Sequence, residues 1–288
     1  MGIRNFISNR KAKRFRRKHK IGLCLSGGGT RGFAYIGVFK ALEEAGIKFD
    51  AVAGTSVGSI FASMYAGGVS SSEMLRFSRQ IKNSDFKNTK LGFLPSSMDR
   101  LESLLDDKLP IKKVEDAKIP LYIPAVDLKS GREICFKSGD LSKIICGSCS
   151  VPGAFHPVKY REYLLIDGGC RNNVPADLLR KNGCDYVVTI DCNSTRGKGT
   201  SSKNFFTKFW ASLDIMTVNN SIKGLDLSDI IITPNLDRFS SLNVEGKEEM
   251  IEEGYKATNQ AIFKIQSLLK GKYKRYVTKE DNKFNNMH

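Results

Sequence analysis

A short buried strand, a glycine-bearing turn and a helix occur twice in succession near the start of the chain, and this order constrains the fold most. Ile21–Ser26 (IGLCLS) is an apolar run that ends at three glycines, which is typical of a buried strand. Residues 31–45 carry apolar side chains at helical spacing, and Gly46 ends this pattern. Phe49–Ala53 predicts a second strand and Ser56–Ala66 a second helix. The repeated order predicts a parallel sheet covered by helices.

Later segments extend this pattern, and 288 residues are within reach of one large α/β domain. Residues 70–110 are more polar and lack strand signals, so they predict short helices, a common place for a lid or substrate-access segment. Residues 195–203 predict a loop. We therefore expect one domain over residues 21–270. Its other predicted elements are strands at Leu121–Val126, Tyr186–Asp191 and Ile230–Thr233, and a long amphipathic helix at Glu245–Leu269.

Positive charge is concentrated at the two ends of the chain. Residues 1–20 hold nine Lys or Arg and no acid, and residues 270–288 hold six against two acids, which leaves only +3 of the net +16 for residues 21–269. We treat 1–20 and 271–288 as basic tails. Such tails attract an anionic membrane surface, and we expect this partner rather than nucleic acid. The alternative is a solvated tail that only maintains solubility.

The seven cysteines are scattered, and only Cys146 and Cys149 form a C-x-x-C pair, so no zinc-ligand spacing is present. We expect no metal and no cofactor, and a reducing compartment. The first 20 residues are too charged for a secretory leader, and no run of 18 apolar residues could span a membrane. The expected location is the cytoplasm, with peripheral attachment to a membrane left open.

Gly54-Thr55-Ser56-Val57-Gly58 matches the pattern G-x-S-x-G between the second strand and the second helix. A nucleophilic serine needs this setting, because a sharp strand-to-helix turn exposes its hydroxyl and the flanking glycines permit the tight turn. Gly54 and Gly58 are the elbow glycines. The alternative is a Gly/Ser turn without chemistry.

Residues 27–32 (GGGTRG) form a second glycine-rich turn at a helix start, where backbone amides can stabilise a negative charge. In acyl transfer this charge is the oxyanion of the tetrahedral intermediate. The same glycines also satisfy the dinucleotide fingerprint G-x-G-x-x-G, so a nucleotide-binding protein is the alternative function. However, the ribose-binding acid should end the second strand, whereas Asp50 begins it.

Asp167, followed by Gly168 and Gly169, comes directly after the short strand Tyr163–Ile166. An Asp-Gly turn is commonly structural, but the chain offers few other bases. Of its three histidines, His19 lies in the basic tail, His288 is the last residue, and His156 lies in a proline-flanked segment. If Ser56 is a nucleophile, its base is therefore His156 or a carboxylate, which becomes a stronger base in a water-poor pocket.

The motifs GGGTRG, GTSVG, SCSVPGAFHPV and DGG, in this order and with these strand contexts, resemble the patatin-like phospholipase family from about Ile21 to Asp191. The resemblance implies a three-layer α/β/α fold with a mainly parallel central sheet. It also implies a serine esterase with a Ser-Asp dyad and an acyl-enzyme intermediate, acting on phospholipids or other acyl lipids without a metal. Two departures are Gly169, where Ala is frequent, and His156, where a small residue or Pro is more usual.

Carried onto this chain, the resemblance assigns Ser56 as nucleophile and Asp167 as its base. The expected oxyanion donors are backbone amides of Gly28, Gly29 and Thr30. Supporting positions are Gly27, Arg31 and Gly32 in the loop, Gly54 and Gly58 in the elbow, and Gly168 and Gly169 in the aspartate motif. The headgroup, the acyl length, the balance between hydrolysis and transacylation, and the oligomeric state do not follow from the sequence. A structural module with a decayed site is a third reading, against which the intact Ser-Asp pair argues.

Overall fold

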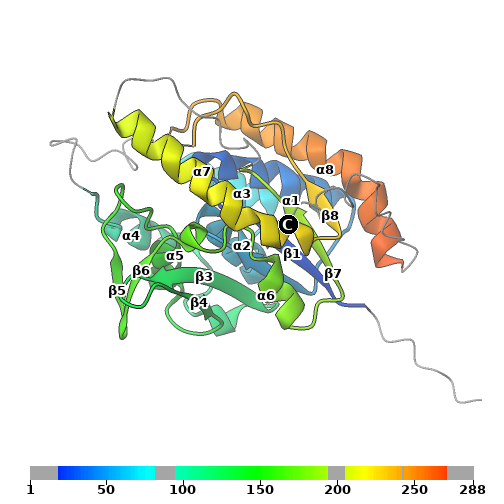
Figure 1. Ribbon diagram of the computed structural model, residues 1–288. Helices are drawn as coiled ribbons and strands as arrows, with labels where there is room; N and C mark the ends of the chain where they lie inside the picture. Colours follow the sequence, from blue (N-terminus) through cyan, green and yellow to red (C-terminus); the bar gives the residue numbers. More distant parts are fainter. Residues whose placement is uncertain (1–18, 82–94, 194–204, 242, 271–288) are drawn as a thin grey trace, which may run out of the picture.

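The computed structural model describes residues 19–81, 95–193, 205–241 and 243–270. The C-terminal tail, all but residues 19 and 20 of the N-terminal tail, the predicted loop at 195–203 and part of the segment 70–110 lie outside these residues. The centre of the molecule is one eight-stranded sheet in the order β5-β6-β3-β2-β1-β7-β8, with β4 paired to β3 (Figure 1).

The sheet combines a parallel part with an antiparallel extension. Its parallel part consists of β3 (Leu121–Asp127), β2 (Ala51–Gly54), β1 (Ile21–Leu25), β7 (Tyr186–Ile190) and β8 (Ile230–Ile232). Its antiparallel part consists of β4 (Arg132–Phe136), β5 (Val158–Tyr160) and β6 (Tyr163–Ile166). The strands predicted from the sequence are present, with ends that differ by two residues or fewer.

Side chains of β1 alternate between two cores because successive residues of a strand point to opposite faces. Leu23 and Leu25 belong to the larger core, whereas Cys24 belongs to the smaller one. The larger core is covered by α1 (Ala34–Glu44), α2 (Val57–Gly67), α3 (Ser71–Ser78), α4 (Asp99–Lys108), α5 (Leu141–Ser148) and α8 (Lys247–Leu269). The smaller core is covered by α6 (Ala176–Lys181) and the end of α7 (Phe205–Asp226), as Figure 1 shows. The expected three-layer α/β/α fold is confirmed.

Helices α1 and α8 pack together through one glycine on each. A Cβ atom at Gly37 would lie 1.8 Å from the carbonyl oxygen of Ile251, and one at Gly254 would lie 2.0 Å from that of Ala34. Any side chain at either position would force the helices apart. Gly254 therefore has a packing role in the long C-terminal helix, which is an integral part of the domain.

Two strands end facing one another along the same edge of β3. Strand β2 pairs with Leu121 and Tyr122, whereas β6 runs antiparallel and pairs with Val126 and Asp127. Because β4 occupies the other edge of β3, β2 and β6 share one edge and approach each other from opposite directions. The residues that follow the two strands, beginning at Thr55 and Asp167, are thereby brought together.

Candidate active site

Ser56 occupies a strained turn between β2 and α2. Its φ of 52° and ψ of −128° are unusual for a residue other than glycine, and among the described residues only Arg161 shares a positive φ without being glycine. The elbow glycines make the turn sterically feasible. A Cβ at Gly54 would lie 2.3 Å from the carbonyl oxygen of Gly58, and one at Gly58 would lie 2.5 Å from that of Leu25. Only glycine fits either position without a shift of the backbone.

Hydrogen bonds from three elements hold the turn in place. The amide of Ser56 donates to Oγ of Ser148 at 3.0 Å, and this hydroxyl donates to the carbonyl of Pro124 in β3 at 2.7 Å. The hydroxyl of Ser59 donates to the Ser56 carbonyl at 2.6 Å. The side chain of Ser56 takes part in none of these bonds, so they fix the backbone while leaving the hydroxyl available.

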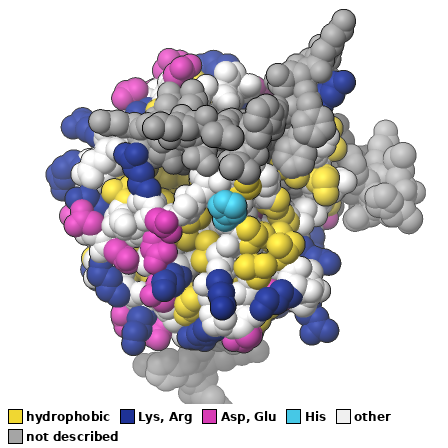
Figure 2. Space-filling model, turned by 90° about the vertical axis from the view of Figure 1, so that its left-hand side faces the viewer, with side chains coloured by type: hydrophobic (Ala, Val, Ile, Leu, Met, Phe, Trp, Pro, Cys, Tyr) yellow, Lys and Arg dark blue, Asp and Glu magenta, His cyan; other side chains and the backbone are white. Residues whose placement is uncertain are grey.

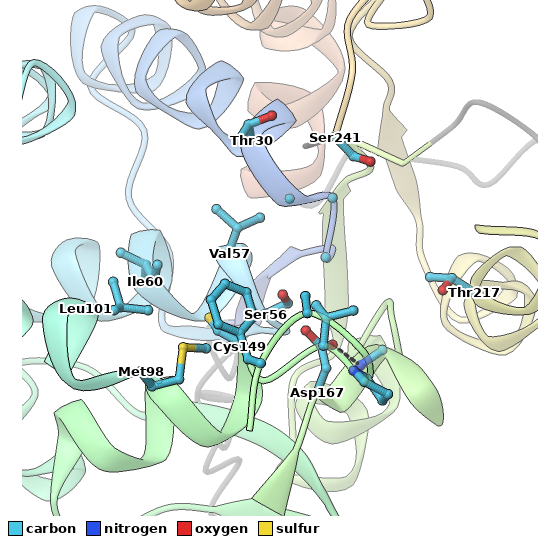
Figure 3. A pocket seen from close by; sticks show the side chains of 18 of the residues that line it. Thr30, Ser56, Val57, Ile60, Met98, Leu101, Cys149, Asp167, Thr217 and Ser241 are labelled. Atoms are coloured by element: carbon cyan, nitrogen blue, oxygen red, sulfur yellow. Dashed lines mark hydrogen bonds between the residues drawn. The ribbon is translucent and has the colours of Figure 1, made fainter. Parts of the chain in front are cut away.

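Asp167 follows β6 and is 5% exposed. Its Oδ1 accepts the amide of Gly169 at 2.7 Å, while its buried Oδ2 has no hydrogen-bond partner among the described residues. Burial raises the pKa of Asp167 to about 6, although the neighbouring Ser56 hydroxyl and the Gly169 amide both lower it. Figure 3 shows the Ser56 and Asp167 side chains next to each other in the pocket. Asp167 thus holds an unsatisfied acceptor atom close to the Ser56 hydroxyl.

The two glycines after Asp167 fit closely against their surroundings. A Cβ at Gly168 would lie 2.5 Å from the carbonyl oxygen of Pro124, and one at Gly169 would lie 3.0 Å from Asp167 Oδ1. Gly168 thus lets the aspartate turn pack against β3. The small residue at 169 leaves room for the carboxylate that its own amide binds.

Two backbone amides of the glycine loop, which lines the same pocket as Ser56 and Asp167, have no hydrogen-bond partner among the described residues. The amide of Gly27 donates to the Asn173 carbonyl at 3.0 Å, and that of Thr30 donates to the Ser241 carbonyl at 3.1 Å. The Thr30 amide is therefore engaged, which removes it from the three expected oxyanion donors in this conformation. The amides of Gly28 and Gly29 donate to no described residue. Gly29 has a φ of +58° and lies against the Ser241 carbonyl, so only glycine fits there.

Arg31 ties the glycine loop to the segments before α8 and after β7. Its Nε donates to the carbonyl of Phe239 at 3.0 Å, and one terminal nitrogen donates to Oδ1 of Asn193 at 3.3 Å. Burial lowers the pKa of the Arg31 guanidinium, although nearby acids oppose this effect. Gly32 permits close packing on α2, because a Cβ there would lie 2.4 Å from Val57 Cγ2. Arg31 and Gly32 thus hold the loop in place and are not among the residues that line the pocket described below.

Two residues of the site were not singled out from the sequence. Ser148 lies within the quoted segment SCSVPGAFHPV, but nothing in its spacing shows that it binds the Ser56 amide. The backbone carbonyl of Asn173 accepts the Gly27 amide. Its side-chain Oδ1 packs against Gly27 so closely that a Cβ at this glycine would lie only 2.3 Å from it. Both contacts join segments far apart in the chain, so a sequence pattern does not reveal them.

A pocket of about 500 Å³ brings the predicted residues together. Ser56, Asp167, Gly169 and residues 27–30 all line it, and most of its remaining surface is apolar. Figure 3 shows Ile60, Met98 and Leu101 on one side of Ser56. An apolar pocket of this size with a few convergent polar groups is the usual form of a small-molecule site.

His156 does not line this pocket, although its neighbour Phe155 does, and its imidazole is exposed. Asp50 lies at the opposite end of the sheet from the glycine loop, where its Oδ2 accepts the amide of Ile21 at 2.9 Å. The acid that the nucleotide reading requires is thus far from the loop that would hold the phosphates. Among the described residues, no three or more His, Cys, Asp or Glu side chains form a group that could bind a metal ion.

The helices within the described parts of the chain include none with the length and apolar character needed to cross a bilayer.

Comparison with known proteins shows which family the chain resembles. Residues 23–180 match the family model described as patatin-like phospholipase. The chain is 32% identical over 195 residues to patatin-like phospholipase domain-containing protein 6 of Mus musculus, covering 60% of this chain and 14% of that protein. It is 27% identical over 273 residues to an uncharacterized NTE family protein of Mycobacterium tuberculosis (strain H37Rv), covering 84% and 46%. The chain thus spans less than half the length of these curated relatives.

Two solved structures share the fold. VipD from Legionella pneumophila superposes with a TM-score of 0.57 at 15% identity, over 86% of this chain and 67% of that one. Human GIVD cytosolic phospholipase A2, in complex with methyl gamma-linolenyl fluorophosphonate, gives a TM-score of 0.52 at 10% identity, over 88% and 59%. These identities support the fold alone. The family match, which covers more than half of its residues, identifies this chain as a member of the patatin-like phospholipase family.

Proposed function

We propose that this protein is a lipid acyl hydrolase in which Ser56 and Asp167 form a catalytic dyad. The observation that carries the proposal is the buried Oδ2 of Asp167, which has no hydrogen-bond partner among the described residues and lies beside the Ser56 hydroxyl. A buried acceptor without a partner is costly in a folded protein. A role as proton acceptor from Ser56 accounts for it.

The first half of the reaction forms an acyl-enzyme. The Ser56 oxygen attacks the carbonyl carbon of the ester while its proton passes to Asp167 Oδ2. The resulting oxyanion is stabilised by the amides of Gly28 and Gly29 and by the N-terminus of α2, where Ser56 is the N-cap residue. The C–O bond to the alcohol then breaks, and the proton on Asp167 passes to the departing oxygen. The acyl group remains as an ester on Ser56.

The second half releases the acyl group. Water attacks the ester on Ser56 while Asp167 accepts a proton from it, and the same two amides hold the second oxyanion. The C–O bond to Ser56 breaks, and the proton on Asp167 returns to the serine oxygen. The products are a fatty acid and the regenerated enzyme. A second alcohol in place of water would give transacylation by the same steps.

An acyl lipid is the substrate class that the pocket fits best. Its lining includes Phe33, Phe61, Phe77 and Leu104 from four different elements, which together offer an apolar surface to an acyl chain. On the face where α4, β5 and β6 lie, Figure 2 shows hydrophobic side chains gathered near the middle, with Lys and Arg below them and a mixture of basic and acidic side chains to the left. An exposed apolar cluster beside the pocket suits a substrate that is presented at a lipid surface.

The proposal is tested by hydrolysis of p-nitrophenyl octanoate and of a lipid panel read by mass spectrometry, with chelator present. We expect Ser56→Ala to abolish turnover and Asp167→Asn to lower kcat by at least about 10³-fold, because the serine then lacks its base. Ser72→Ala removes an exposed hydroxyl on α3 and should match the wild type. Turnover by Ser56→Ala at the wild-type rate would refute the proposal.

The same assay separates a dyad from a triad. Because the His156 imidazole is exposed and outside the pocket lining, His156→Ala should retain kcat within about twofold. A loss as large as that of Asp167→Asn would instead make His156 the base.

A further inference from the structure

The walls of the pocket differ on the two sides of Ser56. On one side lie apolar residues, among them Ile60 of α2, Leu101 of α4 and Met98, which directly precedes α4 (Figure 3). On the other side Figure 3 shows Ser241, before α8, and Thr217 of α7. Asn193 after β7 and Asp214 of α7 also line the pocket, so this lining is mostly polar, with Leu213 of α7 as an apolar member. An ester bound at Ser56 would therefore have its acyl chain on one side and its alcohol on the other.

Asp214 is the one acid of this polar wall. It lies one helical turn before Thr217, is half-buried, and forms no hydrogen bond or ion pair with a described residue. Burial raises the pKa of its carboxyl, although the positive charge of Arg31 opposes this effect. The Arg31 guanidinium, which donates to the carbonyl of Phe239 and to Asn193, acts on Asp214 through its positive charge. The carboxylate oxygens of Asp214 are thus left for a ligand.

The neighbours of Asp214 add further acceptors to the wall. The hydroxyl of Thr217 donates to the Leu213 carbonyl at 2.8 Å, so its oxygen can only accept from a ligand. A wall that combines a carboxylate with such an oxygen binds hydrogen-bond donors well. It repels a second negative charge, since like charges at this depth are poorly screened.

We propose that the polar wall, through Asp214, binds the alcohol part of the ester and selects an uncharged alcohol that carries free hydroxyl groups, such as the glycerol of a monoacylglycerol, over a phosphate-bearing one. This inference rests on the proposed function, because it assigns the leaving group of the same reaction. Asp214 is a specificity-determining residue in this scheme and takes no part in proton transfer.

Arg100 is the competing feature. It also lines the pocket, but it lies in the first turn of α4 on the apolar side, next to Leu101. An anionic headgroup bound there would have to share that side with the acyl chain. The arrangement therefore favours the neutral alcohol at Asp214, and a variant of Arg100 tests the competing arrangement directly.

The test compares kcat/KM at pH 8 for 1-octanoylglycerol and 1-octanoylglycerol 3-phosphate, which share the acyl chain and the ester and differ in the phosphate. We expect the wild type to favour the neutral ester by at least about tenfold, and Asp214→Asn to reduce this ratio at least about tenfold. Asp214→Glu keeps the charge and should keep the preference. Glu252→Gln, which removes an exposed acid of α8, controls for net charge and should leave the ratio unchanged.

Hydrolysis of p-nitrophenyl octanoate by each variant reports whether the chemistry and the fold are intact. An unchanged ratio in Asp214→Asn with full p-nitrophenyl ester activity overturns the inference and leaves the proposed function standing. A wild-type preference for the phosphate ester that Arg100→Gln removes overturns it as well. No turnover of p-nitrophenyl octanoate by the wild type would sink the proposed function, and this inference with it.

Discussion

The amide of Ser56 donates a 3.0 Å hydrogen bond to Oγ of Ser148, and the Ser148 hydroxyl in turn donates to the carbonyl of Pro124 at 2.7 Å. A single side chain from the end of α5 thereby fastens the strained serine turn to β3. The turn also depends on the glycines at 54 and 58, but only the Ser148 contact can be removed without a steric clash. It offers a direct way to ask whether the geometry of the turn matters for activity.

We expect Ser148→Ala to lower both stability and kcat. The buried Ser56 amide and Pro124 carbonyl would each lose a partner, which costs about 1–3 kcal/mol in the free energy of unfolding. Because the turn would relax, kcat should fall at least about tenfold while KM for p-nitrophenyl octanoate changes little. Thermal unfolding and steady-state kinetics measure the two effects.

Ser150→Ala is the matched control for this variant. Ser150 is also fully buried, but its hydroxyl donates to the Cys146 carbonyl and not to the serine turn. We expect this variant to lose stability and to retain kcat. Equal kcat values for Ser148→Ala and the wild type would show that the turn does not need this bond.

The pKa of Asp167, raised to about 6, predicts the pH dependence of the reaction. A base must be deprotonated to accept the proton of Ser56, so kcat/KM for an uncharged ester should fall as the pH drops below about 6. A pH–rate profile with p-nitrophenyl octanoate measures this limb. An acid limb near pH 4, where an unperturbed aspartate titrates, would contradict the assignment.

Stability should change with pH in the opposite sense to activity. Because burial raises the pKa of Asp167 from 3.8 to about 6, the folded protein binds more protons than the unfolded chain between these values, and its stability falls as the pH rises through this window. Asp167→Asn removes the buried charge and can still accept the Gly169 amide. We expect it to be inactive and more stable than the wild type at pH 8, by roughly 2–3 kcal/mol.

Chemical denaturation at pH 8 and pH 4 measures this difference, and the advantage of Asp167→Asn should largely disappear at pH 4. An equal or lower stability of the variant at pH 8 would mean that the Asp167 charge is compensated in the folded protein. Such a result would remove the main physical reason for regarding the carboxylate as a strong base.

Gly29→Ala should abolish activity, whereas Gly46→Ala should not. Both glycines have a similar positive φ, +58° at Gly29 and +64° at Gly46, so alanine strains the backbone by about 1–2 kcal/mol at either position. Only at Gly29 would the added Cβ meet another atom, the Ser241 carbonyl oxygen at 2.2 Å; at Gly46 nothing lies within 4 Å.

The clash at Gly29 would move the two amides that we assign to the oxyanion, so kcat should fall about 10²–10³-fold. Steady-state kinetics of the two variants, with thermal unfolding alongside, separates this effect from general strain. If both variants keep full activity, the loop does not supply the oxyanion donors.

Removal of residues 1–18 should weaken binding to anionic vesicles and leave the hydrolysis of a soluble ester intact. These residues hold eight Lys or Arg and no acid, and each is worth roughly 1 kcal/mol near an anionic leaflet. The truncation should retain Lys20, whose carbonyl accepts the amides of Asp185 and Tyr186. Vesicle sedimentation at low salt measures the effect, and equal binding of both forms would exclude the tail as the attachment site.

The sequence predicted the central strands well because their signal is local. Ile21–Leu25 and Tyr163–Ile166 are short apolar runs between turn residues, and the structure has strands at both. It did not predict β4, whose side chains are mostly half-exposed and of mixed polarity. Helix α7 was not predicted either. Exposed apolar residues such as Met216 alternate along it with residues that line the pocket, such as Thr217, so its sequence shows no single apolar face.

For the site, the sequence predicted the candidate reacting residues but not the hydrogen bonds that hold them in position. Ser56 and Asp167 lie in recognisable turns, and the structure places both in one pocket. The partner of the Ser56 amide is a serine 92 positions away, and the contact depends on how α5 packs on β3. The hydrogen bond of the Thr30 amide could not be predicted for the same reason, because its acceptor, the Ser241 carbonyl, lies in the segment before α8. Such contacts follow from tertiary packing, which a local pattern does not encode.

The most direct test of the account is the site and rate of labelling by a fluorophosphonate probe, read by peptide mass spectrometry in the wild type and in Asp167→Asn. The account predicts a single adduct on Ser56 in the wild type, and labelling at least about 10³-fold slower in Asp167→Asn, since the serine then lacks its base. An adduct on another residue, or equal labelling rates in the two proteins, would contradict it.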